Sequence, residues 1–182
     1  MRDKYKQDTM PELNSDANFN YQLNRVIMWD NGDAAEVMAV SHKIKKSSDW
    51  VITLEQLAEK AHAEGMTANE IAYLRMSEFF IYDTDPKKKQ RYREACGLFY
   101  AYYSDYFNQV IVQRHKVPYY GGYLPVMVTK AQGKNKGVIL LHGGNDSYEF
   151  VFITFSRKVF HDKDIYQLIL TSVNICDIIN IY

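Results

Sequence analysis

The stretch from Val138 to Tyr148, Val-Ile-Leu-Leu-His-Gly-Gly-Asn-Asp-Ser-Tyr, decides how we interpret the fold of this chain. It begins with four consecutive apolar residues, a pattern typical of a strand that is buried on both faces. The apolar run leads directly into His142, Gly143 and Gly144. Glycines let the backbone bend and approach a bound molecule closely, because they carry no side chain. The stretch therefore predicts a buried strand followed by a turn with accessible backbone N–H groups.

The residues before this stretch predict a β-hairpin. From Val110 onward the hydrophobic period changes from 3.6 to 2, so residues 110–117 and 123–129 are expected to form strands around a turn at 119–122. Pro125 cannot donate a hydrogen bond to a ladder, so we expect it at the start of its strand or on a sheet edge. A polar loop at 132–137 then leads to the apolar strand.

The first part of the chain is predicted to be helical. Three local signals mark helix ends: a possible capping box from Thr67 to Glu70, Gly65 before it, and Asp85-Pro86 at a later start. Asn31-Gly32-Asp33 is expected to break an earlier helix. The expected helical ranges are roughly 21–45 with that break, 49–64, 67–82, and 86 to just before 110.

Composition limits the possible partners and locations. The chain has 182 residues, enough for one domain or one domain with a helical appendage, and its 22 basic residues balance its 22 acidic ones. No overall field draws it to nucleic acid or to an anionic membrane, so we expect neither partner. Two cysteines cannot form a disulfide framework, and no signal peptide or membrane span is recognisable, which predicts a cytoplasmic location. The sequence indicates no cofactor and no particular oligomeric state.

The last segment, residues 150–182, differs in composition from the rest. It contains no glycine or alanine but 7 of the 14 isoleucines, and we assign no secondary structure to it. One interpretation is a reading frame broken between Ser147 and Phe150, with an out-of-frame tail. The alternative is a genuine short protein with a divergent end.

The order of features from residue 110 to 148 resembles that of a known family. These features are the hairpin with Tyr-Tyr-Gly-Gly-Tyr-Leu-Pro, the basic loop, the apolar strand and His-Gly-Gly-Asn-Asp-Ser-Tyr. The family is the α/β-hydrolase branch that contains 2,6-dihydroxypseudooxynicotine hydrolase and the fermentation/respiration switch esterase. The resemblance covers roughly residues 20–149. It implies a helical cap over a pocket for a small acyl or aromatic substrate, and cleavage of an ester, acyl or C–C bond by a serine triad.

The resemblance also implies roles for the residues of the turn. The backbone amide of Gly144 or Asn145 would donate to the oxyanion of a tetrahedral intermediate, while His142 and Gly143 orient the turn. We therefore predict an α/β fold in three segments. These are a helical cap at 1–108, the first hairpin and third strand of a truncated α/β-hydrolase core at 109–149, and the divergent tail at 150–182.

The chain departs from the family where the nucleophile is expected. No Gly-x-Ser-x-Gly occurs anywhere in the sequence, and no downstream triad acid or triad histidine is identifiable. We therefore expect a catalytically inactive fragment. A parallel sheet cut after its first strands exposes an apolar edge, so we also expect poor solubility or self-association.

Other candidate sites favour structural roles. Cys96 and His115 are a conceivable nucleophile and base, yet Cys96 lies on an apolar helix stripe that predicts an inert thiol. Neither 161–164 nor 83–85 has the spacing of a metal site, and the basic run at 87–93 is typical of a solvated helix face. The aromatic residues at 92–107 fit a core better than a substrate pocket. A non-enzymatic helical protein-binding module is the alternative function.

Overall fold

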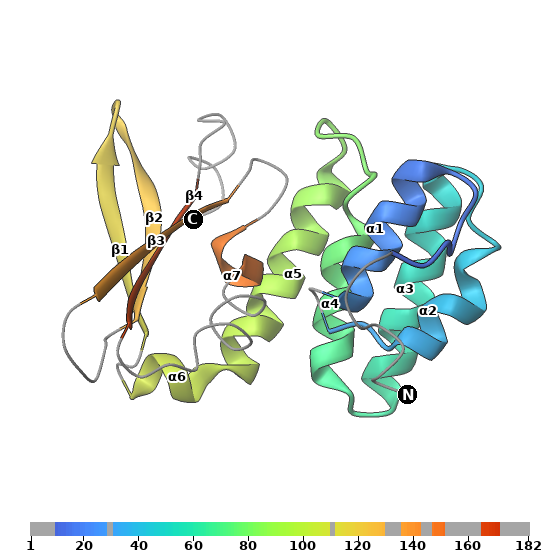
Figure 1. Cartoon of the computed structure of the whole chain (residues 1–182), viewed down its shortest axis with the longest axis horizontal. Helices are drawn as coiled ribbons and strands as arrows, with labels where there is room; N and C mark the ends of the chain where they lie inside the picture. Colours follow the sequence, from blue (N-terminus) through green and yellow to red (C-terminus); the bar gives the residue numbers. More distant parts are fainter. Residues whose placement is uncertain are drawn as a thin grey trace. The chain divides into compact units, whose positions relative to one another are not determined.

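The structure, a computed structural model, describes residues 10–28, 31–109, 112–129, 136–142, 147–151 and 165–171. The chain divides into two compact units, Met1–Leu98 and Phe99–Tyr182, and each is described here by itself. Helices come first and a small sheet follows, so the mixed helix and strand content expected from the sequence is confirmed (Figure 1).

The first unit is helical. Its helices are α1 (Ala17–Met28), α2 (Ala34–Ser41), α3 (Ser47–Ala63), α4 (Thr67–Ser77) and the greater part of α5 (Pro86–Tyr102). The predicted break between the first two helices is confirmed. Asp33 ends the break by capping α2, because its carboxylate accepts the N–H groups of Ala35 and Glu36 at 2.8 and 3.0 Å.

Two of the three predicted helix-end signals are confirmed. Gly65 adopts a left-handed conformation with φ of 69°, and the Met66 N–H donates to the Ala61 carbonyl at 2.8 Å, which closes α3. Asp85 caps α5 through the Lys87 N–H at 2.9 Å, directly before Pro86 in the first helical position.

The predicted capping box at the start of α4 is wrong. Met66 is the capping residue, Thr67 is already helical, and no side chain caps the helix. The Glu70 carboxylate instead lies 3.0 Å from Nδ1 of His62 on α3. This carboxylate therefore pairs with a neighbouring helix rather than with the backbone. The helix also ends at Ser77, several residues earlier than expected.

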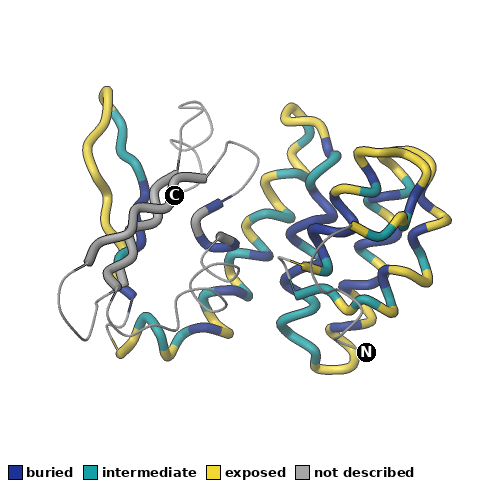
Figure 2. Tube along the Cα trace, in the orientation of Figure 1, coloured by how far each residue is buried: buried dark blue, intermediate teal, exposed yellow. Residues whose placement is uncertain are grey.

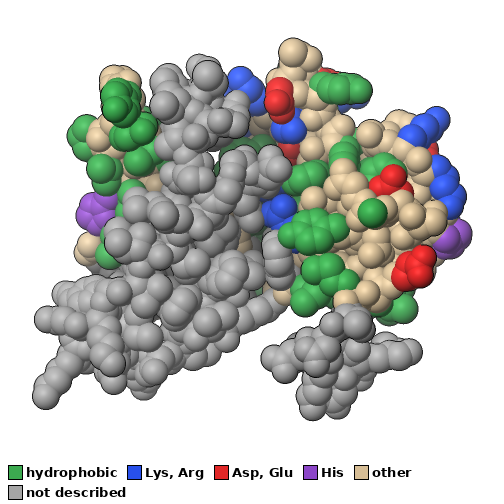
Figure 3. All heavy atoms as spheres, turned by 45° about the horizontal axis from the view of Figure 1, so that its top comes forward, with side chains coloured by type: hydrophobic (Ala, Val, Ile, Leu, Met, Phe, Trp, Pro, Cys, Tyr) green, Lys and Arg blue, Asp and Glu red, His purple; other side chains and the backbone are tan. Residues whose placement is uncertain are grey.

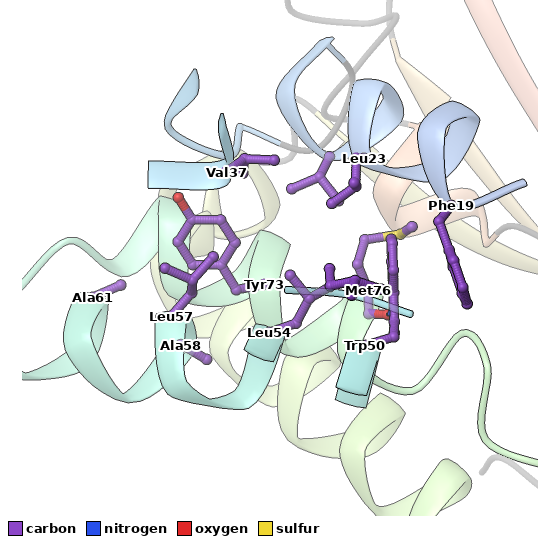
Figure 4. Close-up of a cluster of buried hydrophobic side chains, with 12 residues drawn as sticks. Phe19, Leu23, Val37, Trp50, Leu54, Leu57, Ala58, Ala61, Tyr73 and Met76 are labelled. Atoms are coloured by element: carbon purple, nitrogen blue, oxygen red, sulfur yellow. The ribbon is translucent and has the colours of Figure 1, made fainter. Parts of the chain in front are cut away.

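Trp50 of α3 is fully buried in the core of the helical unit. Its ring stacks near Phe19 and meets Phe80 edge-on, with centroids 6.0 and 5.0 Å away, and its Nε1–H donates to the Met76 carbonyl at 2.7 Å. Buried apolar side chains from four helices form this core together with Trp50 (Figure 4). They include Leu23, Val26, Val37, Leu54, Leu57, Ala58, Ala61 and Tyr73.

The loop between α1 and α2 is held against α4 by Tyr73. The buried Tyr73 hydroxyl accepts the Asp33 N–H at 2.8 Å and donates to the Glu36 carboxylate at 2.7 Å. Gly32 lies so close to this ring and to Val26 that an added Cβ would stand 2.5 Å from Val26 Cγ1 and 2.9 Å from the Val26 carbonyl oxygen. The glycine at this predicted break is therefore required by close packing.

The second unit contains the strands β1 (Val112–Tyr119), β2 (Gly122–Thr129), β3 (Lys136–His142) and β4 (Ile165–Thr171), with the short helices α6 (Ser104–Asn108) and α7 (Tyr148–Val151). The sheet order is β1-β2-β4-β3. The β1–β2 and β2–β4 pairs are antiparallel, whereas β3 and β4 are parallel. The predicted hairpin and apolar strand are both present, but the sequence analysis assigned no element at residues 165–171, where β4 lies.

The hairpin turn has an unusual residue at its tip. Tyr120 and Gly121 connect Tyr119 to Gly122, and both have positive φ, 40° and 80°. Positive φ at both central positions defines a type I′ turn, in which asparagine and glycine are preferred. A tyrosine in the first position therefore carries a local conformational cost.

Pro125 lies within β2, between β1 and β4, so its expected place on an edge or at a strand start is wrong. The β2–β4 register, however, begins at Val126, which pairs with Leu170. Pro125 pairs across only with Lys116 of β1. It therefore lies one residue outside the β4 ladder, where its missing N–H costs no pairing to β4.

Candidate functional site

The predicted oxyanion turn follows β3. His142 is the last residue of β3, and in the ladder it is paired with Thr171, the last residue of the parallel strand β4. Gly143, Gly144 and Asn145 lie outside the described residues, so their predicted roles remain predictions, as does that of His142. Because β3 and β4 are parallel, the turn leaves from the edge of the sheet where the carboxyl ends of both strands meet. This edge is where open α/β sheets bind ligands.

The chain becomes well packed again directly after the turn. Ser147 is buried, and α7 carries Glu149 and Phe150, each only 1% exposed. This short helix packs against β2 and β4. The described elements from β3 onward are a strand, the short helix α7 and the parallel strand β4, which is the order of a βαβ crossover.

The buried carboxylate of Glu149 has a specific partner from the end of α5. The Tyr100 hydroxyl donates to Glu149 Oε1 at 2.9 Å. The guanidinium of Arg114 on β1 lies over the Tyr100 ring at 4.6 Å and over the Phe107 ring at 5.6 Å. These contacts connect a cation, an aromatic ring and a carboxylate within the second unit, and so fix α7 directly after the turn.

Sequence reasoning did not assign a site role to Tyr100, Arg114 or Glu149. One sequence feature could have pointed to Glu149: it is an acidic residue directly followed by the apolar residues Phe150 and Val151. A carboxylate that is buried among apolar residues requires a hydrogen-bonding partner. The partner, however, is 49 residues away. No local pattern identifies it.

The aromatic segment at 92–107 is only partly core: two of its seven aromatic residues are buried, one is exposed and four are half-buried. Phe99 and Tyr103 are buried, and Phe99 packs near Tyr100, Phe107 and Phe150 with centroids 5.2 to 6.1 Å apart. Tyr102, in contrast, is exposed. The segment therefore supplies the packing around Glu149.

The remaining candidates from the sequence form no catalytic or metal site in the described part of the chain. Cys96 is a half-buried thiol on α5, and His115 is exposed on β1. No group of three or more potential metal ligands occurs among the described residues. Asp83 pairs with Lys88 at 3.0 Å. Residues 161–164 lie outside the described part.

Two cations of the basic run on α5, Lys88 and Arg91, form ion pairs within the helical unit. Arg91 binds Glu55 at 2.7 Å and Glu94 at 2.9 Å, and these two hydrogen bonds, that to Glu94 most of all, raise the pKa of Arg91. Hydrogen bonds from Gln90 and then Arg91 lower the pKa of Glu94. The run therefore behaves as a solvated, ion-paired helix face, in agreement with the sequence interpretation.

A groove of about 550 Å³ lies beside these ion pairs in the helical unit. Its floor is apolar, with Ala58, Leu74 and Leu98, and its rim carries charged side chains from α3, α4 and α5. The rim residues are Glu55, Glu59, His62, Glu70, Arg91 and Glu94. Most of these rim side chains are paired with one another, but four glutamates face one arginine and one histidine, so the edge of the groove is polar and net acidic.

Within the described residues, no helix is both long enough and apolar enough to cross a membrane. A scan of protein-family models finds no match to this chain, and a search of curated proteins finds no relative. The function must therefore be argued from the geometry of the chain itself.

Proposed function

We propose that this chain is the helical cap and the N-terminal part of the core of an α/β-hydrolase-like serine hydrolase. The backbone amide of Gly144 or Asn145 donates to the oxyanion, and His142 and Gly143 orient the turn. The parent reaction is hydrolysis of an ester, acyl or C–C bond in a small acyl or aromatic substrate. The chain itself is inactive, because it contains no Gly-x-Ser-x-Gly nucleophile turn.

One observation carries the proposal: the turn after β3 leaves from the carboxyl ends of two adjacent parallel strands, as the pairing of His142 with Thr171 requires. In α/β-hydrolases the loop between the third strand and the following helix supplies an oxyanion-hole N–H. Here α7 follows the turn directly, and its buried Glu149 anchors it to Tyr100. This anchoring of α7 supports the proposal, because oxyanion stabilisation requires backbone donors that are held in place.

Two measurements test the proposal. A fluorophosphonate probe, followed by mass spectrometry, is expected to label no serine in the folded chain, and labelling at a single serine would refute the absence of a nucleophile. Hydrogen exchange is expected to find the amides of both 136–142 and 165–171 protected, because β3 and β4 pair with each other. Rapid exchange in both segments would remove the structural basis of the proposal.

A non-enzymatic binding module is the second candidate, and the groove along α3, α4 and α5 favours it. An apolar floor with a charged rim is typical of a surface that accepts an amphipathic helix. The two candidates differ in the region that binds. For the module, Leu74→Glu on the groove floor would abolish capture of a partner, whereas for the hydrolase the effective substitutions would lie at the turn after β3.

A further inference from the structure

The outer strand β1 of the sheet is exposed and carries basic side chains. β1 pairs with β2 on one side, and no described strand lies on its other side. From Gln113 to Tyr120 every residue is exposed, as the tube in Figure 2 shows for the hairpin. An outer strand of this kind presents backbone N–H and C=O groups to which another extended segment can add.

The charged side chains of the hairpin have a single sign. No aspartate or glutamate occurs from residue 106 to 145, although acidic and basic residues balance over the whole chain. The face of the hairpin seen in Figure 3 accordingly carries hydrophobic side chains and a histidine but no acidic side chain. Arg114 and Lys116 are two residues apart, so they share one face of β1.

The outer edge of β1 is defined by the hairpin register. The two-residue turn is closed by Tyr119 and Gly122, and hydrogen-bonded pairs alternate along an antiparallel ladder. The backbone groups of residues 114, 116 and 118 therefore point to the outer edge. Pro118 has no N–H to offer there, so an added strand finds its donors at residues 114 and 116, the two that carry the cationic side chains.

The same residues disfavour pairing of β1 with a second copy of itself. Antiparallel pairing of two β1 strands would place Arg114 and Lys116 of one copy beside those of the other, and like charges opposite each other destabilise a sheet. A strand with acidic residues at every second position would instead place its carboxylates beside these cations. Arg114 lies over the Tyr100 ring at 4.6 Å and Lys116 over the Tyr123 ring at 4.5 Å, and these contacts orient the two cations.

We propose that the outer edge of β1 binds an extended acidic segment of a partner protein by strand addition, with carboxylates at alternate positions next to Arg114 and Lys116. Backbone pairing at 112–117 supplies the geometry, and the single-sign charge selects the partner. This inference does not depend on the hydrolase proposal. Its surface lies on the hairpin, not on the turn after β3.

The test uses the whole chain and a fluorescein-labelled peptide with the sequence Glu-Val-Glu-Val-Glu-Val. Two probes serve as comparisons: Glu-Pro-Glu-Pro-Glu-Pro, which has the same charge but cannot form a ladder, and single-stranded oligothymidylate. In fluorescence anisotropy titrations, the chain is expected to bind the valine peptide at least about 10-fold more tightly than the proline peptide. Only the valine peptide can pair with β1 through its backbone. Changes in the NMR chemical shifts of backbone amides on addition of the valine peptide, confined to residues 112–117, would locate the binding site on β1.

Charge-reversal variants complete the test. Lys116→Glu is expected to weaken binding of the valine peptide about 10-fold, and Lys116→Gln by a smaller factor. Lys89→Glu, at another exposed lysine, is the matched control and is expected to change the affinity less than about 2-fold. Equal binding of the proline peptide, tighter binding of oligothymidylate, or equal effects of Lys116→Glu and Lys89→Glu would each overturn the proposal.

Discussion

Replacing Tyr73 with phenylalanine removes one hydroxyl that joins the α1–α2 loop to α4, and leaves the buried ring in place. The hydroxyl makes two hydrogen bonds, from the Asp33 N–H and to the Glu36 carboxylate. A hydrogen bond to a charged group contributes about 1.5–3 kcal/mol and one to a neutral group about 0.5–1.5 kcal/mol. Glu36 keeps its ion pair with Lys60 at 2.7 Å, so we expect a loss of about 2 kcal/mol in the free energy of unfolding.

The pH dependence gives this prediction a second, independent observable. Burial, and then the hydrogen bond to Glu36, raise the pKa of Tyr73 above its ordinary value. The stabilisation from neutral Tyr73 is therefore complete below pH 10, the ordinary tyrosine pKa of about 10, and is lost as the pH rises further. Above pH 10 the free energy of unfolding of the native chain should fall by about 1.4 kcal/mol per pH unit relative to that of Tyr73→Phe. This fall continues until the two proteins are equally stable.

Urea unfolding followed by tryptophan fluorescence measures both effects. Both tryptophans of the chain, at positions 29 and 50, lie in the first unit, so the signal reports the helical unit. Tyr82→Phe is the matched control, because Tyr82 is 84% exposed and its loss should change stability by less than about 0.5 kcal/mol. If Tyr73→Phe were as stable as the native chain at pH 7, or if the two pH profiles ran parallel up to pH 11, the reasoning would fail.

Three further predictions concern single features. Gly32→Ala should destabilise the helical unit by about 1–3 kcal/mol in urea unfolding, because the new Cβ meets the fixed Val26 carbonyl; an unchanged midpoint would contradict the close packing. Tyr120→Asn should stabilise the hairpin by about 1 kcal/mol, because asparagine tolerates the left-handed conformation. Slower amide hydrogen exchange in β1 and β2 would verify this prediction, and faster exchange would contradict it. The chain should self-associate in sedimentation velocity because β3 ends the described sheet; a monomer at all concentrations would count against an exposed apolar edge.

Local chemistry accounts for the features that the sequence predicted well. Asp33, Gly65 and Asp85 mark helix ends because a short carboxylate or a left-handed glycine satisfies backbone groups within a few residues. The capping box at Thr67 failed for the opposite reason. His62, on the preceding helix, offers Glu70 a different partner, and sequence spacing alone does not include that competition.

Features that depend on distant pairing were not predictable from the sequence. The strand β4 lies in a segment with no clear hydrophobic period, and it inserts between β2 and β3 although it follows both in the chain. The bond between Tyr100 and Glu149 likewise spans the hairpin and the turn. In both cases the stabilising contacts join segments that are far apart in the sequence, so they leave no local pattern in the residues involved.

The coding DNA downstream of the codon for Thr171, the last residue of β4, gives the most direct test of the hydrolase account. Resequencing the gene and translating it in all three forward frames would reveal whether the hydrolase core continues. The account predicts that another frame encodes a Gly-x-Ser-x-Gly turn followed by an aspartate and a histidine, the missing nucleophile and its partners. If no frame encodes them, the hydrolase proposal is contradicted, and the helical binding module becomes the function to pursue.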